Sequence, residues 1–204
     1  MIEINKTRIY KKGGDLLTKN PYTKKYEKID PRHSKLAAAV KKGLSQTGIK
    51  ENSRVLYLGA SHGYTPGHVS NIVGKGGLVF CVENSVVVAR DLVLLCKEKS
   101  NMHPLIFSAD KPGDYKDRLV GVDVVYQDVA QKNQVGIFLK NLGLVKKGGF
   151  GLLALKARSY DVSKKPGVVF KEVLKELEKE TNVVDFKLLD PYEKDHAFYV
   201  VKKK

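Results

Sequence analysis

From residue 54 onward, short apolar segments alternate with segments of helical periodicity, and this pattern most restricts the possible folds. Apolar runs such as 54–58 (RVLYL) and 122–127 (VDVVYQ) are typical of buried strands, whereas 85–99 carries its apolar residues at helical spacing. Strands that alternate with helices predict a parallel sheet covered on both faces. The remaining segments assigned in this way are strands at 78–82, 104–107, 150–155, 183–189 and 197–202, and helices at 65–73, 133–142 and 166–180.

The last two predicted strands are joined by a connection that is too short for a parallel crossover. The linking residues are DPYEKDH, whereas a crossover needs roughly a dozen residues or more. We therefore expect these strands to form an antiparallel hairpin at the end of the sheet.

The first thirty residues have a different pattern. Two segments, MIEINKTRIYKKGG and YTKKYEKI, alternate apolar and polar residues, and a Gly13-Gly14 break separates them. This pattern predicts a small β unit. We divide the chain into 1–50, a basic N-terminal β subdomain with a leading helix, and 51–204, the α/β domain.

The charge of the chain points to an anionic partner. Lys and Arg number 37 against 22 Asp and Glu, a net charge of +15, and residues 1–54 alone hold 14 basic and 5 acidic side chains. Nucleic acid suits this charge better than a membrane surface, because the sequence shows no basic amphipathic anchor. There is also no signal-like start and no apolar run of about 20 residues, so we expect a cytoplasmic protein without a membrane partner.

The two cysteines do not suggest a disulfide framework or a metal site. Cys81 lies in the apolar run 78–82, where we expect it to be buried, and no CxxC pair is present. We predict no metal ligands in this chain.

A glycine-containing turn follows the first strand of the α/β domain. Gly59 to Gly63 joins the strand at 54–58 to a helix, and such turns hold ligands at the carboxyl edge of parallel sheets. Glu83, which ends the next strand, can accept hydrogen bonds from ribose hydroxyls. The spacing is GxxxG and not GxGxxG, so the pattern favours an adenosine-containing ligand while leaving dinucleotides and S-adenosylmethionine both open.

Polar residues follow three other strands at the same predicted edge. Asp128 closes the strand at 122–127, Lys156 follows 150–155, and His196 begins the last strand. Each also has a structural interpretation: Asp128 as a helix N-cap, which we favour when it is taken alone, Lys156 as a strand-end lysine and His196 as a structural histidine. Lys35 begins an alanine-rich helix and, by itself, predicts only a solvated lysine.

Several of these stretches together resemble the fibrillarin family in its shorter archaeal form. The combination of DVAQ with a later YE-x-DHA is especially specific, and the similarity extends over about 30–204. The stretches that carry it are HSKLAAAV at 33–40, VLYLGASHGYTPGHVSNIVG at 55–74, VDVVYQDVAQ at 122–131, ALKARS at 154–159 and PYEKDHA at 191–197.

The resemblance implies a class I S-adenosylmethionine-dependent methyltransferase fold, a Rossmann-like seven-stranded sheet with an antiparallel last strand. It implies 2′-O-methylation of ribose in rRNA, with tRNA as a further substrate class. The implied partners are a C/D-box guide RNA, the target rRNA, a Nop-family scaffold protein and a kink-turn-binding protein.

The resemblance also assigns roles to particular residues. The family's catalytic tetrad falls on Lys35, Asp128, Lys156 and His196. Lys156 would contact the ribose hydroxyl, as a general base or to orient it, and His196 would hold the group together or pass the proton on. The implied cofactor-binding residues are Gly59, Ala60, Gly63, Tyr64, Thr65, Glu83, Asn84, Ser108, Ala109, Asp110, Asp128 and Gln131.

The sequence departs from the family where adenine is expected to bind. Asn84 stands where an aromatic residue usually follows Glu83, and Ser108-Ala109-Asp110 replaces Asp-Ala-Arg. These departures keep one alternative open, a non-catalytic RNA-particle scaffold with a methyltransferase fold. A stand-alone RNA methyltransferase and an enzyme for a base or small molecule are further alternatives, whereas the GxxxG spacing disfavours a nicotinamide dehydrogenase.

Overall fold

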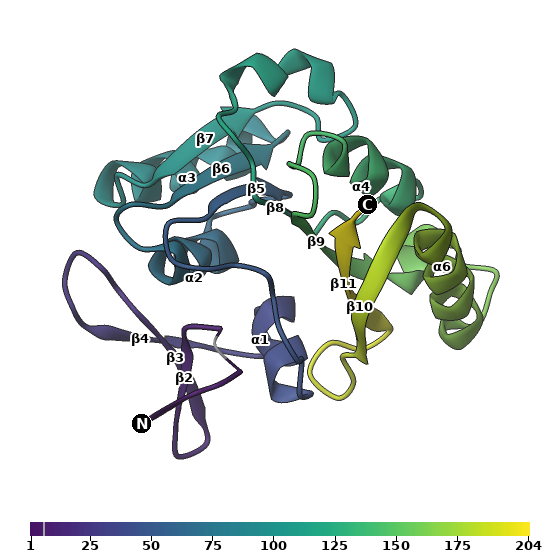
Figure 1. The fold of residues 1–204 in the computed structure, drawn as a ribbon, viewed down its shortest axis with the longest axis horizontal. Helices are drawn as coiled ribbons and strands as arrows, with labels where there is room; N and C mark the ends of the chain where they lie inside the picture. Colours follow the sequence, from purple (N-terminus) through teal and green to yellow (C-terminus); the bar gives the residue numbers. More distant parts are fainter. Residues whose placement is uncertain (6) are drawn as a thin grey trace.

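A computed structural model of the chain, which describes residues 1–5 and 7–204, contains a large seven-stranded sheet and a small four-stranded one (Figure 1). The large sheet has the order β10-β11-β9-β8-β5-β6-β7. Its strands are β5 (Arg54–Leu58), β6 (Leu78–Glu83), β7 (Met102–Ile106), β8 (Val124–Gln127), β9 (Phe150–Lys156), β10 (Thr181–Leu188) and β11 (His196–Lys203).

The strand directions confirm the predicted architecture. The pairs from β7 through β9 are all parallel, and β11 is antiparallel to both β9 and β10. The predicted β10–β11 hairpin is therefore present. It brings the start of β11 to the same edge of the sheet as the carboxyl ends of the parallel strands.

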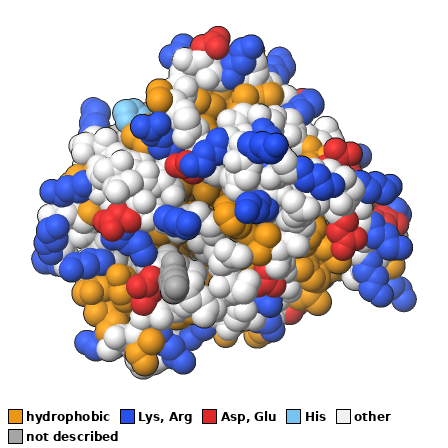
Figure 2. Space-filling model, viewed as in Figure 1, with side chains coloured by type: hydrophobic (Ala, Val, Ile, Leu, Met, Phe, Trp, Pro, Cys, Tyr) orange, Lys and Arg blue, Asp and Glu red, His pale blue; other side chains and the backbone are white. Residues whose placement is uncertain are grey.

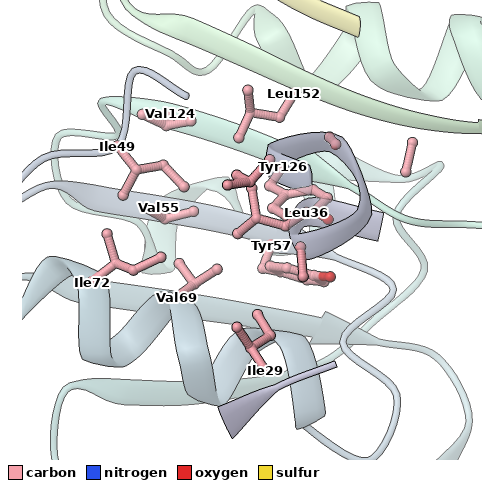
Figure 3. Packing of buried hydrophobic residues seen from close by; sticks show 14 of the residues in the cluster. Ile29, Leu36, Ile49, Val55, Tyr57, Val69, Ile72, Val124, Tyr126 and Leu152 are labelled. Atoms are coloured by element: carbon pink, nitrogen blue, oxygen red, sulfur yellow. The ribbon is translucent and has the colours of Figure 1, made fainter. Parts of the chain in front are cut away.

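Helices cover both faces of this sheet, as the alternation predicts. Leu36 of α1 and Val69 of α2 pack with Tyr57 and Tyr126 on one face, which Figure 3 shows from close by. Helices α4 and α6 supply Phe138 and other buried residues to the opposite face. The helices are α1 (Lys35–Lys41), α2 (Tyr64–Val73), α3 (Val86–Glu98), α4 (Gln134–Leu142), α5 (Ala157–Tyr160) and α6 (Pro166–Glu180).

The N-terminal residues form the expected small β unit. Strands β1 (Ile2–Glu3), β2 (Ile9–Lys12), β3 (Asp15–Lys19) and β4 (Tyr26–Ile29) make an antiparallel sheet in sequential order. Ile9, Leu16 and Ile29 are buried in the same apolar cluster as Leu36 of α1 and Val69 of α2. The small sheet therefore shares its core with one face of the large sheet, while the division of the chain at residue 50 remains a prediction.

A group of polar side chains, all buried except that of Glu27, also joins the small sheet to α2. Thr18 Oγ1 lies 2.7 Å from His68 Nδ1 and accepts a hydrogen bond of 2.9 Å from Asn71 Nδ2. Asn71 Nδ2 also donates to Glu27 Oε2 at 2.7 Å, and Lys99 Nζ donates to Asn71 Oδ1 at 2.6 Å. We call these five residues the interface network. Burial lowers the pKa of His68 to about 4, so this histidine is neutral near pH 7.

The sequence predictions differ from the structure mainly in short elements. Strand β7 begins at Met102, two residues earlier than predicted, and ends at Ile106, one residue earlier. The one-turn helix α5 and two 3₁₀ turns, at Pro112–Asp114 and Lys116–Arg118, were not predicted. Cys81 is buried as expected, in a core strand. In the described part of the chain, no helix is both long and apolar enough to cross a bilayer.

Candidate active site

The glycine turn between β5 and α2 has a backbone shape that depends on its glycines. Gly59 has φ +80°, and a Cβ added there would collide with the carbonyl oxygen of Asp128. Gly63, at φ +92°, is the N-cap of α2. The Gly59 and Ala60 amides both donate to the Val82 carbonyl, at 2.9 and 3.0 Å, which ties the turn to β6. The turn is thereby packed directly against the end of β8.

Glu83 lies beside this turn at the end of β6, as predicted. Its carboxylate accepts a hydrogen bond from the backbone N–H of Ser61 and another from that of Ser85, each at 2.9 Å. The side chain is half-buried, so its orientation is fixed while part of it stays accessible. Two fixed carboxylate oxygens at this edge are well placed to accept further hydrogen bonds from vicinal hydroxyls.

The residues predicted to lie near adenine follow β6 and β7. Asn84 is exposed immediately after Glu83. The carbonyl of Ala109 accepts a hydrogen bond of 2.8 Å from Asn141 Nδ2 of α4, and Asp110 forms an ion pair of 2.8 Å with Lys140. The 108–110 loop is thus fastened to α4, and the Asp110 carboxylate is already paired with a cation of this helix.

The other predicted cofactor residues lie around the start of α2 and after β8. Thr65 is buried in the first turn of α2, and Gln131 is exposed in the loop after β8. Tyr64 Oη accepts a hydrogen bond of 2.9 Å from the Asp30 amide, so its ring packs against the segment that leads into α1. Tyr64 and Gly63 of the glycine turn line one cavity together, which the interface network also borders.

One cavity of about 340 Å³ brings together the four residues of the tetrad. It opens at the carboxyl edge of the sheet and includes Gly59 and Ser61 of the glycine turn. Its full lining is Lys35, Gly59, Ser61, Asp128, Val129, Ala130, Ala154, Lys156, Glu193 and His196. The residues that the resemblance assigned to catalysis are therefore neighbours in space, although they come from four distant parts of the chain.

Asp128 occupies the centre of this cavity and does not cap a helix. Helix α4 begins at Gln134 with Asn133 as its N-cap residue, so the interpretation of Asp128 as an N-cap is wrong. The chain leaves β8 through a loop of several residues before α4 begins, which places the Asp128 carboxylate beside Lys35 instead. Its Oδ1 lies 3.4 Å from Lys35 Nζ.

The protonation of Asp128 reflects two opposing effects. Burial raises the pKa of its carboxyl, because the charged form loses solvation, and the nearby Lys35 ammonium partly offsets this increase. The Lys35 and Asp128 side chains are 22% and 21% exposed, so the pair is neither fully solvated nor sealed from water. Lys35 is positioned by α1, whose N-cap, Ser34, accepts a hydrogen bond from the Ala37 amide.

His196 begins β11 in a defined tautomer. Its Nδ1 lies 2.7 Å from the Lys194 carbonyl, which can only accept, so Nδ1 carries the hydrogen. Burial lowers the pKa of His196, while the bond to the Lys194 carbonyl raises it in part. The imidazole is therefore neutral near pH 7, and its Nε2 retains a lone pair that can accept a proton.

Glu193 is a member of this cluster that the sequence prediction missed. Its Oε1 lies 3.9 Å from Lys35 Nζ, and its Oε2 lies 4.0 Å from His196 Nδ1. The residue was visible within the PYEKDHA stretch, but an acidic residue in a loop gives no signal of its own. It places a second carboxylate beside Lys35.

Among residues 1–5 and 7–204, no group of three or more His, Cys, Asp or Glu side chains is arranged to hold a metal ion. The polar side chains of the cavity are two lysines, two carboxylates, one imidazole and one serine hydroxyl. Such a set can bind hydroxyl groups, neutralise charge and move a proton.

The fibrillarin family model matches residues 6–204, nearly the whole chain. This chain belongs to the fibrillarin family.

Individual relatives agree with this membership. The fibrillarin-like rRNA/tRNA 2′-O-methyltransferase of Thermococcus onnurineus is 48% identical over 179 residues, which cover 87% of this chain and 79% of that protein. The solved fibrillarin/Nop5p complex gives a TM-score of 0.89 at 37% identity, with 97% of this chain and 98% of that one covered. Aeropyrum pernix fibrillarin, solved with natively bound S-adenosyl-L-methionine, gives 0.79 at 35% identity, covering 98% and 84%. The predicted methyltransferase fold class is thus confirmed.

Proposed function

We propose that this fibrillarin-family chain transfers a methyl group from S-adenosylmethionine to the 2′-hydroxyl of a ribose in RNA. The observation that carries the proposal is the single cavity that contains Lys35, Asp128, Lys156 and His196 next to the glycine turn. Relatives named as rRNA/tRNA 2′-O-methyltransferases support the reaction type, and a relative solved with S-adenosyl-L-methionine supports the methyl donor.

The residues at the glycine turn fit S-adenosylmethionine. Gly59 has no side chain, so the turn lies directly against the Asp128 carbonyl at the end of β8, beside the cavity where the methionine part of the donor would bind. Glu83, held by two backbone amides, can accept hydrogen bonds from the ribose hydroxyls of the donor. Gly63, Thr65, Asp128 and Gln131 complete the proposed site, with Ala60, Tyr64, Asn84 and residues 108–110 at its periphery. When bound, S-adenosylmethionine supplies an electrophilic methyl group on a positively charged sulfur.

The chain provides the groups that position the attacking hydroxyl. The 2′-oxygen forms a bond to the methyl carbon as the bond between that carbon and sulfur breaks, and the hydroxyl proton must leave. Lys156, at the end of β9, donates a hydrogen bond to this oxygen and orients it. Neutral His196, which faces Lys156 across the β9–β11 pair, accepts the departing proton at Nε2.

Lys35 and the two carboxylates keep this arrangement in place. The ionised form of Asp128 lies beside Lys35 and stabilises positive charge at the reaction centre. Glu193 shares Lys35 with Asp128 and lies on the Nδ1 side of the histidine. Val129 and Ala154 supply apolar parts of the cavity lining.

The target nucleotide is selected by partners and not by this chain. A relative has been solved in complex with Nop5p, which supports a Nop-family scaffold as one partner. Figure 2 shows lysine and arginine side chains distributed over the visible face, and the net charge of +15 favours sequence-independent attraction to phosphate. We therefore propose a cytoplasmic particle in which a C/D-box guide RNA pairs with target rRNA or tRNA and a kink-turn-binding protein joins the scaffold.

A reconstitution experiment tests this proposal. Methyl transfer to a synthetic target RNA is measured with the chain alone and then with guide RNA, the Nop-family scaffold and the kink-turn-binding protein. We expect donor binding by the isolated chain and site-specific 2′-O-methylation only in the complete particle. Efficient site-specific methylation by the chain alone would favour a stand-alone methyltransferase, and a chain that does not bind the donor would favour a scaffold.

The donor site has its own test at Glu83. The Glu83→Ala variant loses the acceptors for the ribose hydroxyls, so we expect donor binding to weaken by roughly 1–3 kcal/mol. Calorimetric titration with S-adenosylmethionine measures this difference. An unchanged affinity would remove Glu83 from the site.

A further inference from the structure

The hydrogen-bonded ladder between β8 and β9 ends before the catalytic edge of the sheet. Its last aligned pair is Gln127 with Leu153, and β9 then continues for three more residues to Lys156. Because β8 turns away at Asp128, the backbone of Lys156 has no strand beside it on this side. Its N–H and C=O therefore need another partner, or they would lie unpaired near the edge of the core.

The side chain of Gln134 supplies this partner. The Lys156 amide donates to Gln134 Oε1 at 3.0 Å, and Gln134 Nε2 donates to the Lys156 carbonyl at 3.1 Å. Gln134 is the first residue of α4 and is 0% exposed. A primary amide, like a peptide group, carries an acceptor oxygen next to an N–H donor. The side chain of Gln134 therefore replaces the missing strand at this one position.

This contact also defines how Lys156 faces His196. The two residues are aligned in the antiparallel β9–β11 pair. Since the N–H and C=O of Lys156 both bind Gln134, they are directed away from β11, and Lys156 and His196 form a non-hydrogen-bonded pair. In such pairs the opposing Cα atoms approach to about 4.5 Å and the side chains lie closer together than in hydrogen-bonded pairs.

The position of Gln134 is itself fixed from β8. The Gln127 side chain donates to the Gln134 carbonyl at 2.7 Å, and Gln127 is also 0% exposed. Gln127 directly precedes Asp128 in the chain. Two buried amide side chains thus connect the backbone next to Asp128 with the backbone of Lys156, through the first residue of α4.

We propose that Gln134 is a positioning residue for methyl transfer, which holds the backbone of Lys156 so that its side chain reaches the ribose hydroxyl. The proposal rests on the proposed function, since it gives Lys156 the acceptor hydroxyl as its target. Gln134 does not touch the substrate and acts only through Lys156. Its side chain has no part in the glycine turn, so it leaves donor binding unchanged.

The test compares two substitutions in the reconstituted particle. Gln134→Met removes both hydrogen bonds at similar volume, and Gln134→Glu keeps the shape but, when ionised, has no donor for the Lys156 carbonyl. Asn101→Leu is the matched control, because Asn101 is a buried amide that also donates to two backbone carbonyls, those of Ser70 and Gly74, at the opposite end of the sheet. Single-turnover methylation, donor affinity and thermal stability are measured for each variant.

We expect Gln134→Met to slow single-turnover methylation at least tenfold more than Asn101→Leu does. The donor affinity of Gln134→Met should equal that of the wild-type chain. The Gln134→Glu variant should recover as the pH falls, because a protonated carboxyl group has one donor and one acceptor and can replace the amide. Its rate relative to wild type should therefore rise toward acid, whereas that of Gln134→Met stays constant. Equal losses in Gln134→Met and the control, or a Gln134→Glu ratio that does not change with pH, would overturn the proposal.

A second measurement keeps this proposal separate from the proposed function. Hydrogen exchange at the Lys156 amide is followed in the isolated chain, without RNA. Gln134→Met should accelerate exchange at this amide by tenfold or more, and Asn101→Leu should not. An inactive wild-type particle would refute the proposed function, while an unchanged Lys156 exchange rate would refute the role of Gln134 whether or not the particle is active.

Discussion

Two groups of polar side chains in this molecule differ in how closely their members are paired. In the interface network, hydrogen bonds of 2.6–2.9 Å join Thr18, His68, Asn71, Glu27 and Lys99. In the catalytic cavity, the polar groups of Lys35, Asp128, Glu193 and His196 lie 3.4–4.0 Å apart around an open volume. The members of the first group bind one another, and those of the second leave space between them for other atoms.

The difference shows why a shifted pKa alone does not identify an active site. Burial lowers the pKa of His68 in the network and also that of His196 in the cavity. What separates them is their surroundings: His68 belongs to a chain of short hydrogen bonds, whereas His196 lies in a cluster of groups that are 3.4–4.0 Å apart. A shifted pKa indicates chemistry only together with the geometry around the group.

The largest expected effect is at Lys156. Lys156→Ala removes the group that orients the hydroxyl, so we expect single-turnover methylation to fall by about 100-fold or more. Donor affinity, measured by calorimetry, should persist. If the rate survives, Lys156 is only a strand-end lysine and the cavity is not the reaction centre.

A smaller effect on methylation, without a loss of stability, is expected at Asp128. Asp128→Asn should slow methylation by roughly 10- to 100-fold, the worth of one charged hydrogen bond, and should also weaken donor binding. The raised pKa of Asp128 means that its ionised form costs stability at neutral pH, so the variant should melt no lower than wild type. A clear loss of thermal stability would show that the carboxylate is structural.

The interface network should respond in stability and not in catalysis. Unfolded His68 takes up a proton below about pH 6.5, whereas the folded residue does so only near its pKa of about 4. Stability should therefore fall as the pH decreases from 6.5 to 4, by about 1–3 kcal/mol from this residue.

The His68→Gln variant tests this expectation, because glutamine does not titrate in this range. Chemical denaturation of wild type and variant across pH 4–7 should show a flatter dependence for the variant. Methylation per folded molecule at neutral pH should match that of wild type. A loss of activity without a loss of stability would contradict the separation between the two groups.

The smallest effect is expected in the pH profile at His196. Because burial lowers its pKa, the imidazole stays neutral below its ordinary value of 6.5, and methylation should decline with acid only beneath that value. His196→Gln should remove this acid decline and reduce the plateau rate by roughly tenfold. Rates measured in the complete particle from pH 5 to 8 provide the check, and a decline centred at or above pH 6.5 would exclude His196 as the titrating group.

The sequence predicts the order of strands and helices well because each element has its own periodicity. The apolar runs at β5, β6 and β9 and the capped helix α3 are local features that need no knowledge of the fold. Strand β7 is displaced because its residues, MHPLI, mix a histidine and a proline into a short run. The 3₁₀ turns and α5 are too short to create a periodic signal.

The candidate site is predictable only where a residue follows a strand or belongs to a recognised stretch. Asp128, Lys156 and His196 lie at strand ends that the alternation places on one edge. Glu193 and Gln134 escape prediction because their partners are far away in the chain, and only the folded loops bring them into contact. The assignment of Asp128 as a cap is wrong even though the helix was predicted to begin at 133, next to its observed start at Gln134, because Asp128 was interpreted without regard to that boundary.

Lys35 comes from a part of the chain that lies outside the alternating α/β unit. This lysine starts α1, and α1 shares its core with the small N-terminal sheet, so a wall of the catalytic cavity is made by chain that precedes the alternating α/β unit. The N-terminal segment is thus not a detachable tag for recognising RNA. The small sheet and the α/β unit follow one another along the chain, but the catalytic group draws on both. An α/β unit joined to a different N-terminal segment would have a complete sheet and an incomplete catalytic group.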